Sequence, residues 1–288
     1  MKKILLSCLV FLLFLTGCVH HSPYDKEYFF QAMGEDSEII ITMDADRLKD
    51  GGYLVGYDDP LLKELIKRSE RVNIAFHTDT ENYPSQFSDY SYYGGLEGNY
   101  GPLVVNNALR FNKDFEEVEA DGISFFRSDL VEAKVPRGGL LVFSSDDYPS
   151  AYQKTVKNRE IYIDPTIASR LGDSVIGLYL KDPKTIIDLG FDLPQPVIQK
   201  MREAIVYILE DGSDLSLNAD ITMENESSAR TMTTLLRNWV LFNIRKMGKR
   251  PDIQELSKKY YYEGDSVKVR NHTLTKETLS KLTRPVTE

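Results

Sequence analysis

The pattern of apolar and polar residues along the chain predicts a series of short β-strands. In the clearest of them Val72, Ile74 and Phe76 alternate with other residues, so this strand is expected to bury its Val72 side and leave its Asn73 side outside. A turn centred on Gly264 predicts a β-hairpin near the C-terminus. The predicted strands cover residues 38–43, 72–77, 123–126, 131–135, 140–143, 174–180, 215–221, 260–262 and 267–269, with one more at the end of residues 79–100.

Helical spacing of apolar residues predicts helices between these strands. The strongest pattern follows Asn225, whose side chain can cap a helix start, and it ends at Gly248. Asp59 before Pro60 is a second cap, with proline at the first helical position. Helices are therefore expected at residues 60–66, 102–111, from about 149, at 196–209 and 226–247, and after Thr275.

The order of these elements is the same in two parts of the chain: strand, helix, strand pair, helix, hairpin and helix. The sequence therefore predicts an α+β fold made of two degenerate repeats of mixed strand-helix units with largely antiparallel sheets. The first half is placed at residues 37–170 and the second at residues 171–288. The two halves form either one large domain or two small ones.

The first residues have the pattern of an export signal. Two lysines precede an apolar run at residues 4–15, and this run is shorter than the roughly 20 residues that span a bilayer. The run leads into Leu15-Thr16-Gly17-Cys18, which resembles the lipobox of bacterial lipoproteins. The resemblance implies that residues 1–17 are a cleaved lipoprotein signal peptide and that Cys18 carries acyl chains such as palmitate.

Acyl chains on Cys18 would hold the protein at a membrane, because several chains together make a stable anchor. Residues 18–36 are then a flexible tether from the cell membrane or outer membrane to a folded part in the periplasm or at the cell surface. Cys8 leaves with the signal peptide, so no thiol is expected in the folded part. The layout of a lipobox followed by two such halves resembles uncharacterised lipoproteins of spirochaetes.

The charge of the chain argues against one class of partner. The chain has 44 acidic against 35 basic residues, and the signal peptide takes two of the lysines with it. An acidic excess opposes binding to nucleic acid phosphates and to anionic lipid headgroups, because both require clustered cations. We therefore expect no nucleic acid partner, and we expect the membrane to be reached through the acyl chains on Cys18.

Candidate catalytic groups are few. Beyond the tether the histidines are His77 in a strand and His272 in a turn, and a lone histidine is more often structural than a general base. Three aspartates from Asp44 to Asp50 match the start of a calcium loop, but the glutamate that an EF-hand requires is missing. No cofactor or metal is predicted, and the protein is expected not to be an enzyme. The alternative is an envelope hydrolase with two carboxylates held about 5 to 10 Å apart.

A group of tyrosines near several glycines is the candidate binding surface. Tyrosine combines a large contact area with a polar end, which suits recognition of a protein or a glycan. The alternative is that these glycines and tyrosines build a twisted edge hairpin that packs on its own sheet. The leading hypothesis is a non-enzymatic binding or structural lipoprotein with an envelope protein, peptide or glycan partner, and a carrier of an apolar ligand is a further alternative. The candidate residues are Tyr83, Tyr90, Tyr92, Tyr93 and Tyr100.

Overall fold

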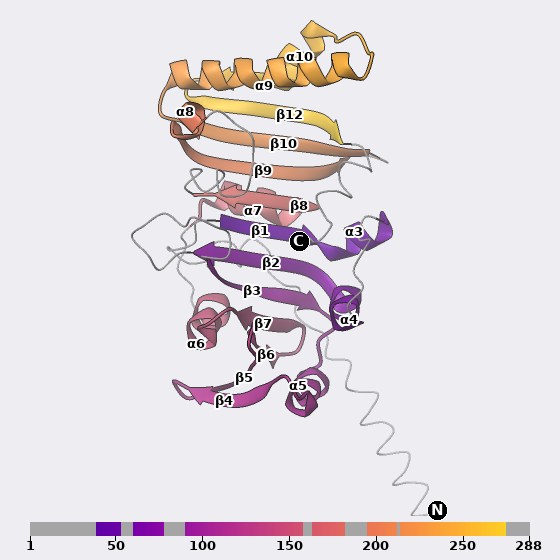
Figure 1. Cartoon of the computed structure of the whole chain (residues 1–288), viewed down its shortest axis with the longest axis vertical. Coiled ribbons are helices and arrows are strands. Elements are labelled where there is room, and N and C mark those ends of the chain that lie inside the picture. The colour runs from indigo at the N-terminus through magenta and orange to yellow at the C-terminus, as the bar shows by residue number, and fades with distance from the viewer. Residues whose placement is uncertain are drawn as a thin grey trace, which may run out of the picture.

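A twelve-stranded β-sheet runs through the computed structural model, which describes residues 39–52, 60–77, 90–157, 163–181, 195–211 and 214–274 (Figure 1). The elements up to residue 157 are β1 (Ile39–Asp44), α3 (Ala45–Asp50), α4 (Pro60–Arg68), β2 (Ser69–His77), β3 (Ser91–Gly98), α5 (Pro102–Phe111), β4 (Glu116–Ala120), β5 (Ile123–Arg127), β6 (Glu132–Arg137), β7 (Leu140–Ser144), α6 (Tyr148–Tyr152) and the π-helical turn η2 (Gln153–Lys157). The later elements are α7 (Pro165–Asp173), β8 (Ile176–Leu180), α8 (Gln195–Ile198), β9 (Met201–Asp211), β10 (Asp214–Met223), α9 (Glu226–Lys246), α10 (Ile253–Lys259), β11 (Tyr260–Glu263) and β12 (Ser266–Leu274).

The strands lie in the order β11-β12-β10-β9-β8-β1-β2-β3-β7-β6-β5-β4, and all neighbouring pairs are antiparallel. The strands cross the long axis of the molecule, with β12 and α9 toward one end and β4 and α5 at the other (Figure 1). The prediction of an α+β fold with largely antiparallel pairing is confirmed.

The two parts of the chain meet at β1 and β8, which pair at the middle of the sheet. Outward from β1 come β2, β3, β7, β6, β5 and β4, and outward from β8 come β9, β10, β12 and β11. A helix follows the second strand outward in each direction, α5 after β3 and α9 after β10. The predicted repeat stays a prediction. The predicted boundary between residues 170 and 171 falls inside α7.

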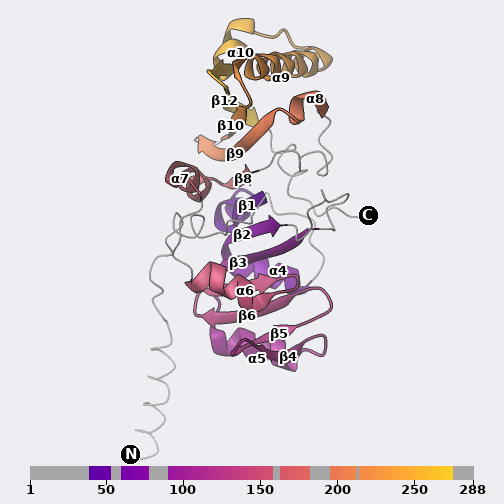
Figure 2. The same cartoon turned by 90° about the vertical axis from the view of Figure 1, so that its left-hand side faces the viewer.

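Both faces of the central strands are buried. Ile39 and Ile40 point to opposite faces of β1, and both are 0% exposed. On the Ile39 face α9 packs with Val240 over β10 and β12, and on the Ile40 face α6 and α7 pack, the latter with Leu171. In Figure 2 α7 and α9 lie on different sides of the sheet. The helices therefore complete a hydrophobic core on each face.

The helix α9 begins and ends where the sequence predicts. Asn225 is its N-cap, and the side-chain Oδ1 accepts from Ser228 N at 3.0 Å. Gly248, two residues after the last helical residue, has a φ of +74°, a left-handed conformation that glycine adopts without strain. The predicted hairpin is also confirmed, because Tyr260 pairs with Val269 across the β11–β12 register.

The prediction of a helix over residues 196–209 is wrong. Only the short α8 is helical in this range, and β9 begins at Met201 in the interior of the sheet. Ala204, Ile205, Tyr207 and Ile208 are all buried, because a hydrophobic core covers β9 on both faces. A strand buried on both faces does not alternate, so its apolar spacing can match that of a helix.

The strand β2 forms as predicted, but the face expected outside is the more buried one. Arg71, Asn73 and Ala75 are 2% exposed or less, whereas Val72 and Ile74 are only partly buried. The physical reason is that α7 covers the Asn73 side. The sequence pattern did not predict β4, α7 or α10. The predictions for the signal peptide, the tether with Cys18, the Asp59 cap, Tyr83 and the helix after Thr275 lie outside the described residues.

Candidate functional site

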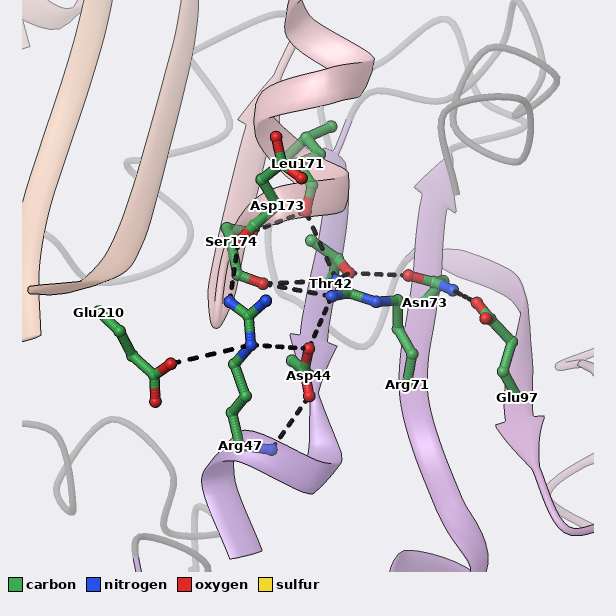
Figure 3. Close-up of polar contacts among 10 residues, drawn as sticks. All are labelled: Thr42, Asp44, Arg47, Arg71, Asn73, Glu97, Leu171, Asp173, Ser174 and Glu210. Atoms are coloured by element: carbon green, nitrogen blue, oxygen red, sulfur yellow. Dashed lines mark hydrogen bonds and ion pairs between the residues drawn. The ribbon is translucent and has the colours of Figure 1, made fainter. Parts of the chain in front are cut away.

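A line of buried polar side chains crosses β3, β2 and β1 on the face that α7 covers (Figure 3). Asn73 Nδ2 donates to Glu97 Oε1 at 2.7 Å, and Thr42 Oγ1 donates to Asn73 Oδ1 at 2.8 Å. Glu97 is 6% exposed, and the other two are 0% exposed. A slip of one residue in strand pairing would leave such buried groups unpaired at a cost of about 1–3 kcal/mol each. This polar network therefore stabilises one register of the central strands.

Arg71 lies at the centre of the polar network and links it to α7. Its Nη2 donates to Asp44 Oδ2 at 3.0 Å, and its Nη1 donates to Thr42 Oγ1 at 3.0 Å. The guanidinium also approaches the carbonyl oxygens of Leu171 and Ser174, at 3.5 and 3.4 Å, where α7 ends (Figure 3). A cation is favourable at the C-terminal end of a helix. Arg71 thus holds two strands and one helix together.

Asp44, the first of the three aspartates considered for calcium, is occupied by contacts within the same chain. Its Oδ1 accepts from Arg47 N at 3.0 Å as the N-cap of α3, and its Oδ2 lies 3.4 Å from Arg47 Nε. Asp46 pairs with Lys49 Nζ at 2.7 Å. In the described ranges, no group of three or more His, Cys, Asp and Glu residues is placed to hold a metal ion. The role that the geometry supports for the polar network is structural.

A polar pocket of about 370 Å³ lies beside α6, over the neighbouring strands β2, β3 and β7. Its titratable lining groups are His77, Asp146, Asp147 and Lys154, and buried Tyr93 forms part of its wall. The ring centroids of His77 and Tyr93 are 5.7 Å apart, and Lys154 Nζ lies 4.9 Å from the Tyr93 centroid. The structure therefore brings the predicted histidine candidate together with a lysine and two carboxylates.

Both aspartates of this pocket accept hydrogen bonds from neighbouring groups of the protein. Asp146 Oδ2 accepts from Ser91 Oγ at 2.7 Å, and Asp147 Oδ1 accepts from Ser150 N at 3.0 Å as the N-cap of α6. The two residues belong to one turn, so they do not face each other from opposite walls. Glycoside hydrolysis uses two carboxylates that flank the scissile bond. This arrangement therefore does not reproduce the geometry of that reaction.

The histidine predicted in a turn, His272, lies in β12 instead. Its Nδ1 is 2.5 Å from the hydroxyl oxygen of Tyr260, and the residue is partly buried. Burial, and to a smaller extent the charge of Lys259, lowers the pKa of His272. Burial also raises the pKa of Tyr260 to about 12. The pair is a neutral hydrogen bond that supports the β11–β12 hairpin.

The structure corrects the prediction of a tyrosine surface, because most of these residues are inside the protein. Tyr90, Tyr93 and Tyr100 are 5%, 2% and 0% exposed, Tyr92 is partly buried, and Tyr83 lies outside the described residues. The strand β3 lies between β2 and β7 in the interior of the sheet. Its side chains therefore point into the hydrophobic cores on the two faces. The described tyrosines therefore pack on their own sheet, as in the alternative interpretation, but β3 is an interior strand and not part of the edge hairpin that this interpretation expected.

Large apolar side chains are exposed on α5 and α9, which the sequence did not single out as surfaces. Leu103 and Phe111 of α5 are 80% and 81% exposed, and Trp239 and Phe242 of α9 are 64% and 65% exposed. Trp239 fits the apolar spacing of α9 but lies outside its buried stripe. The two helices occupy opposite ends of the molecule (Figure 1). A partner that covers such side chains gains about 25 cal/mol per Å² of apolar area buried.

Comparison with known proteins finds a shared fold. No protein-family model and no curated protein matches the sequence. Crystal forms III, IV and I of TP0453, a protein of the spirochaete Treponema, are similar, with TM-scores of 0.60, 0.60 and 0.59 at 12% sequence identity. The alignments cover 88–89% of this chain and 95–96% of the TP0453 chain. The likeness extends over nearly the whole architecture, and at this identity it concerns the fold alone.

Proposed function

We propose that the protein is a lipid-anchored lipoprotein of the cell envelope whose folded part is a non-enzymatic binding module. The observation that carries the proposal is the lipobox that ends in Cys18, with no other cysteine in the rest of the chain after it. The fold shared with a spirochaetal protein supports the resemblance to spirochaetal lipoproteins. Over the residues described, the structure contains no helix that is both long enough and apolar enough to cross a bilayer.

The buried carboxylates support binding rather than catalysis. Asp44 pairs with Arg71, and Glu132, which is 3% exposed, accepts from Arg127 Nε at 2.6 Å and from Tyr148 N at 2.7 Å. A general acid or base must exchange its proton with a substrate. The oxygens of these two carboxylates are instead occupied by donors of the protein itself. Such groups hold the fold together.

The exposed apolar side chains of α5 and α9 are the contact surface that the geometry supports best. Burial of large apolar and aromatic side chains contributes most of the binding energy in protein interfaces. A glycan presents mainly hydroxyl groups, so an apolar surface fits a protein partner better. We therefore infer a protein of the cell envelope as the partner.

The anchor is tested by metabolic labelling with palmitate. Wild type and Cys8→Ser, the matched control, are expected to carry label, whereas Cys18→Ser carries none, because only the lipobox cysteine is acylated. Detergent, and not high salt, is expected to release the labelled protein from membranes. Label that persists in Cys18→Ser, or release by salt alone, contradicts the proposed anchor.

The contact surface is tested by cross-linking in intact cells. A double variant with Trp239→Ser and Phe242→Ser is compared with Asn238→Ser, an exposed polar control on the same helix. The partner that wild type captures should be lost from the double variant and retained in the control. The same capture by all three proteins counts against α9, and Phe111→Ser then examines α5 in the same way.

The alternative function is an envelope hydrolase, and the pocket lined by His77, Asp146 and Asp147 is where it is tested, although its two aspartates do not face each other. Purified full-length protein is incubated with envelope glycan, and soluble products are measured. Hydrolysis that disappears in Asp146→Asn and persists in Asn238→Ser would replace the non-enzymatic proposal. Carriage of an apolar ligand requires an apolar cavity of roughly 300 Å³ or more, and the charged lining of this pocket does not support it.

A further inference from the structure

Three cations converge on one carboxylate on the sheet face that α7 covers. Asp220 of β10 accepts from Arg170 of α7 and from Arg270 of β12, and Lys268 Nζ lies 3.0 Å from Asp220 Oδ1. The Asp220 side chain is 10% exposed, whereas the side chains of Arg170, Arg270 and Lys268 are 36%, 27% and 20% exposed. The carboxylate therefore lies beneath a rim of basic groups that are accessible to solvent.

The sheet and its neighbouring helix hold these basic groups in place. Lys268 is the direct partner of Asp220 in the β10–β12 register. Arg270 Nη1 donates to two backbone carbonyl oxygens, each at 2.8 Å. The guanidinium of Arg170 lies 5.8 Å from the centre of the Tyr207 ring, a contact that favours a cation over the ring face. The cations are thus positioned before any ligand arrives.

The direct contacts leave positive charge in excess. One carboxylate neutralises only one of the three cations. Burial by itself raises the pKa of Asp220, but hydrogen bonds from Arg270 and Lys268 outweigh burial and hold the pKa below its usual value. Asp220 is therefore charged at neutral pH, and the cluster of four residues has a surplus of two positive charges.

The acids on neighbouring elements accept hydrogen bonds from other groups, and of these acids Asp164 also acts on Arg170 through its charge. Glu203 of β9 accepts from the hydroxyl of Tyr179 at 2.7 Å. Asp164 accepts from Thr166 N at 2.8 Å as the N-cap of α7. A guanidinium and an ammonium each carry several N–H donors, and the contacts described above use only part of them. The remaining donors can bond an anion that approaches from solvent.

We propose that Arg170, Lys268 and Arg270 bind the phosphate group of a phosphate monoester. Such a group carries roughly −1.5 to −2 charge at pH 7, which matches the surplus of the cluster. The guanidinium of an arginine binds an oxyanion through two parallel N–H···O hydrogen bonds, and lysine adds a compact point charge. Asp220 is a positioning residue that holds the cations from the core side. The acidic composition of the whole chain does not oppose this site, because close contacts act at shorter range than the screened field of distant charges.

The site is tested on the full chain in neutral detergent, by titration with inorganic phosphate at constant ionic strength. Arg170→Gln and Lys268→Gln each remove one charged donor. We expect each to raise the dissociation constant of inorganic phosphate about 10-fold or more. Arg245→Gln is the matched control, because Arg245 is exposed near the end of α9 on the other face of the sheet. Circular dichroism verifies that each variant is folded.

The outcomes separate two sources of the phosphate group. If phosphatidic acid in the micelles competes with inorganic phosphate and phosphatidylcholine does not, the ligand is a lipid headgroup; without competition it is a soluble phosphorylated compound. Binding that does not saturate, or equal weakening by Arg245→Gln, overturns the proposal. Should Arg170→Gln fail to fold, Lys268→Gln decides, because Lys268 is a partly buried residue of β12 whose paired group Asp220 keeps its two arginine partners.

Discussion

Replacement of Arg71 by methionine tests how much the polar network stabilises the centre of the sheet. Arg71 is 2% exposed, and methionine keeps an unbranched side chain without its charge. The change removes the ion pair of Arg71 with Asp44 at 3.0 Å and leaves Asp44 with Arg47 Nε at 3.4 Å. Loss of one partner of a buried pair costs about 3–5 kcal/mol. Because the contact with Arg47 remains, we expect a loss of about 3 kcal/mol in the free energy of unfolding.

A double variant, Asp44→Asn with Arg71→Met, separates the ion pair from the other contacts. Asparagine can still accept from Arg47 N and so keep the cap of α3, but it leaves no unpaired charge. We expect the double variant to be less destabilised than the sum of the single variants, with a coupling of about 1–3 kcal/mol.

The measurement is urea unfolding at neutral pH, followed by far-ultraviolet circular dichroism. Tryptophan fluorescence would report poorly on the core, because Trp239 is 64% exposed. A loss of 3 kcal/mol should also lower the thermal midpoint by roughly 6–12 °C. A loss below about 1 kcal/mol in Arg71→Met, or strict additivity in the double variant, would refute the stabilising role of the pair.

Three further changes test other parts of the molecule. In Gly177→Ala a Cβ would lie 2.7 Å from Ser174 Oγ, so we expect a loss of about 1–3 kcal/mol, and an unchanged urea midpoint would contradict the close approach of α7 to the sheet. The lowered pKa of His272 means that the unfolded chain binds a proton at higher pH than the native one, so stability should fall as pH decreases below about 6.5. His272→Asn should make this decline of stability shallower between pH 7 and 5. An equal slope of stability against pH in both proteins would contradict the lowered pKa of His272. Trp239→Ser should change the free energy of unfolding by less than about 0.5 kcal/mol, because the side chain is mostly exposed; a loss above 1 kcal/mol would mean that it packs.

Features that depend on neighbouring residues could be predicted from the sequence. The α9 helix starts at the Asn225 cap and is followed by Gly248, because capping and left-handed backbone are properties of single residues and their nearest turn. The β11–β12 hairpin likewise follows from its short turn, which sets the pairing of Tyr260 with Val269. The lipobox is also a local signal, and the anchor at Cys18 stays a prediction.

Features that depend on what covers a face could not be predicted in this way. Residues 201–211 form a strand buried on both faces, so the alternation that identifies a strand is absent. Tyr93 and Tyr100 were expected at a surface and are buried, Tyr93 because β3 lies in the interior of the sheet and Tyr100 because it packs with Val135 and Leu141. The sequence pattern shows which residues share a face of a strand, but not which layer packs against that face.

The candidate sites were decided by the tertiary structure. Arg71 and Asp44 come together through the antiparallel register of β1 and β2, and Arg170 reaches Asp220 because α7 packs over strands that are formed 50 residues later in the chain. The sequence by itself determined local elements and an acidic composition, and it predicts an export signal. The positions of individual charges depended on strand order and register, because electrostatic and hydrogen-bond contacts act over a few ångströms in space regardless of distance along the chain.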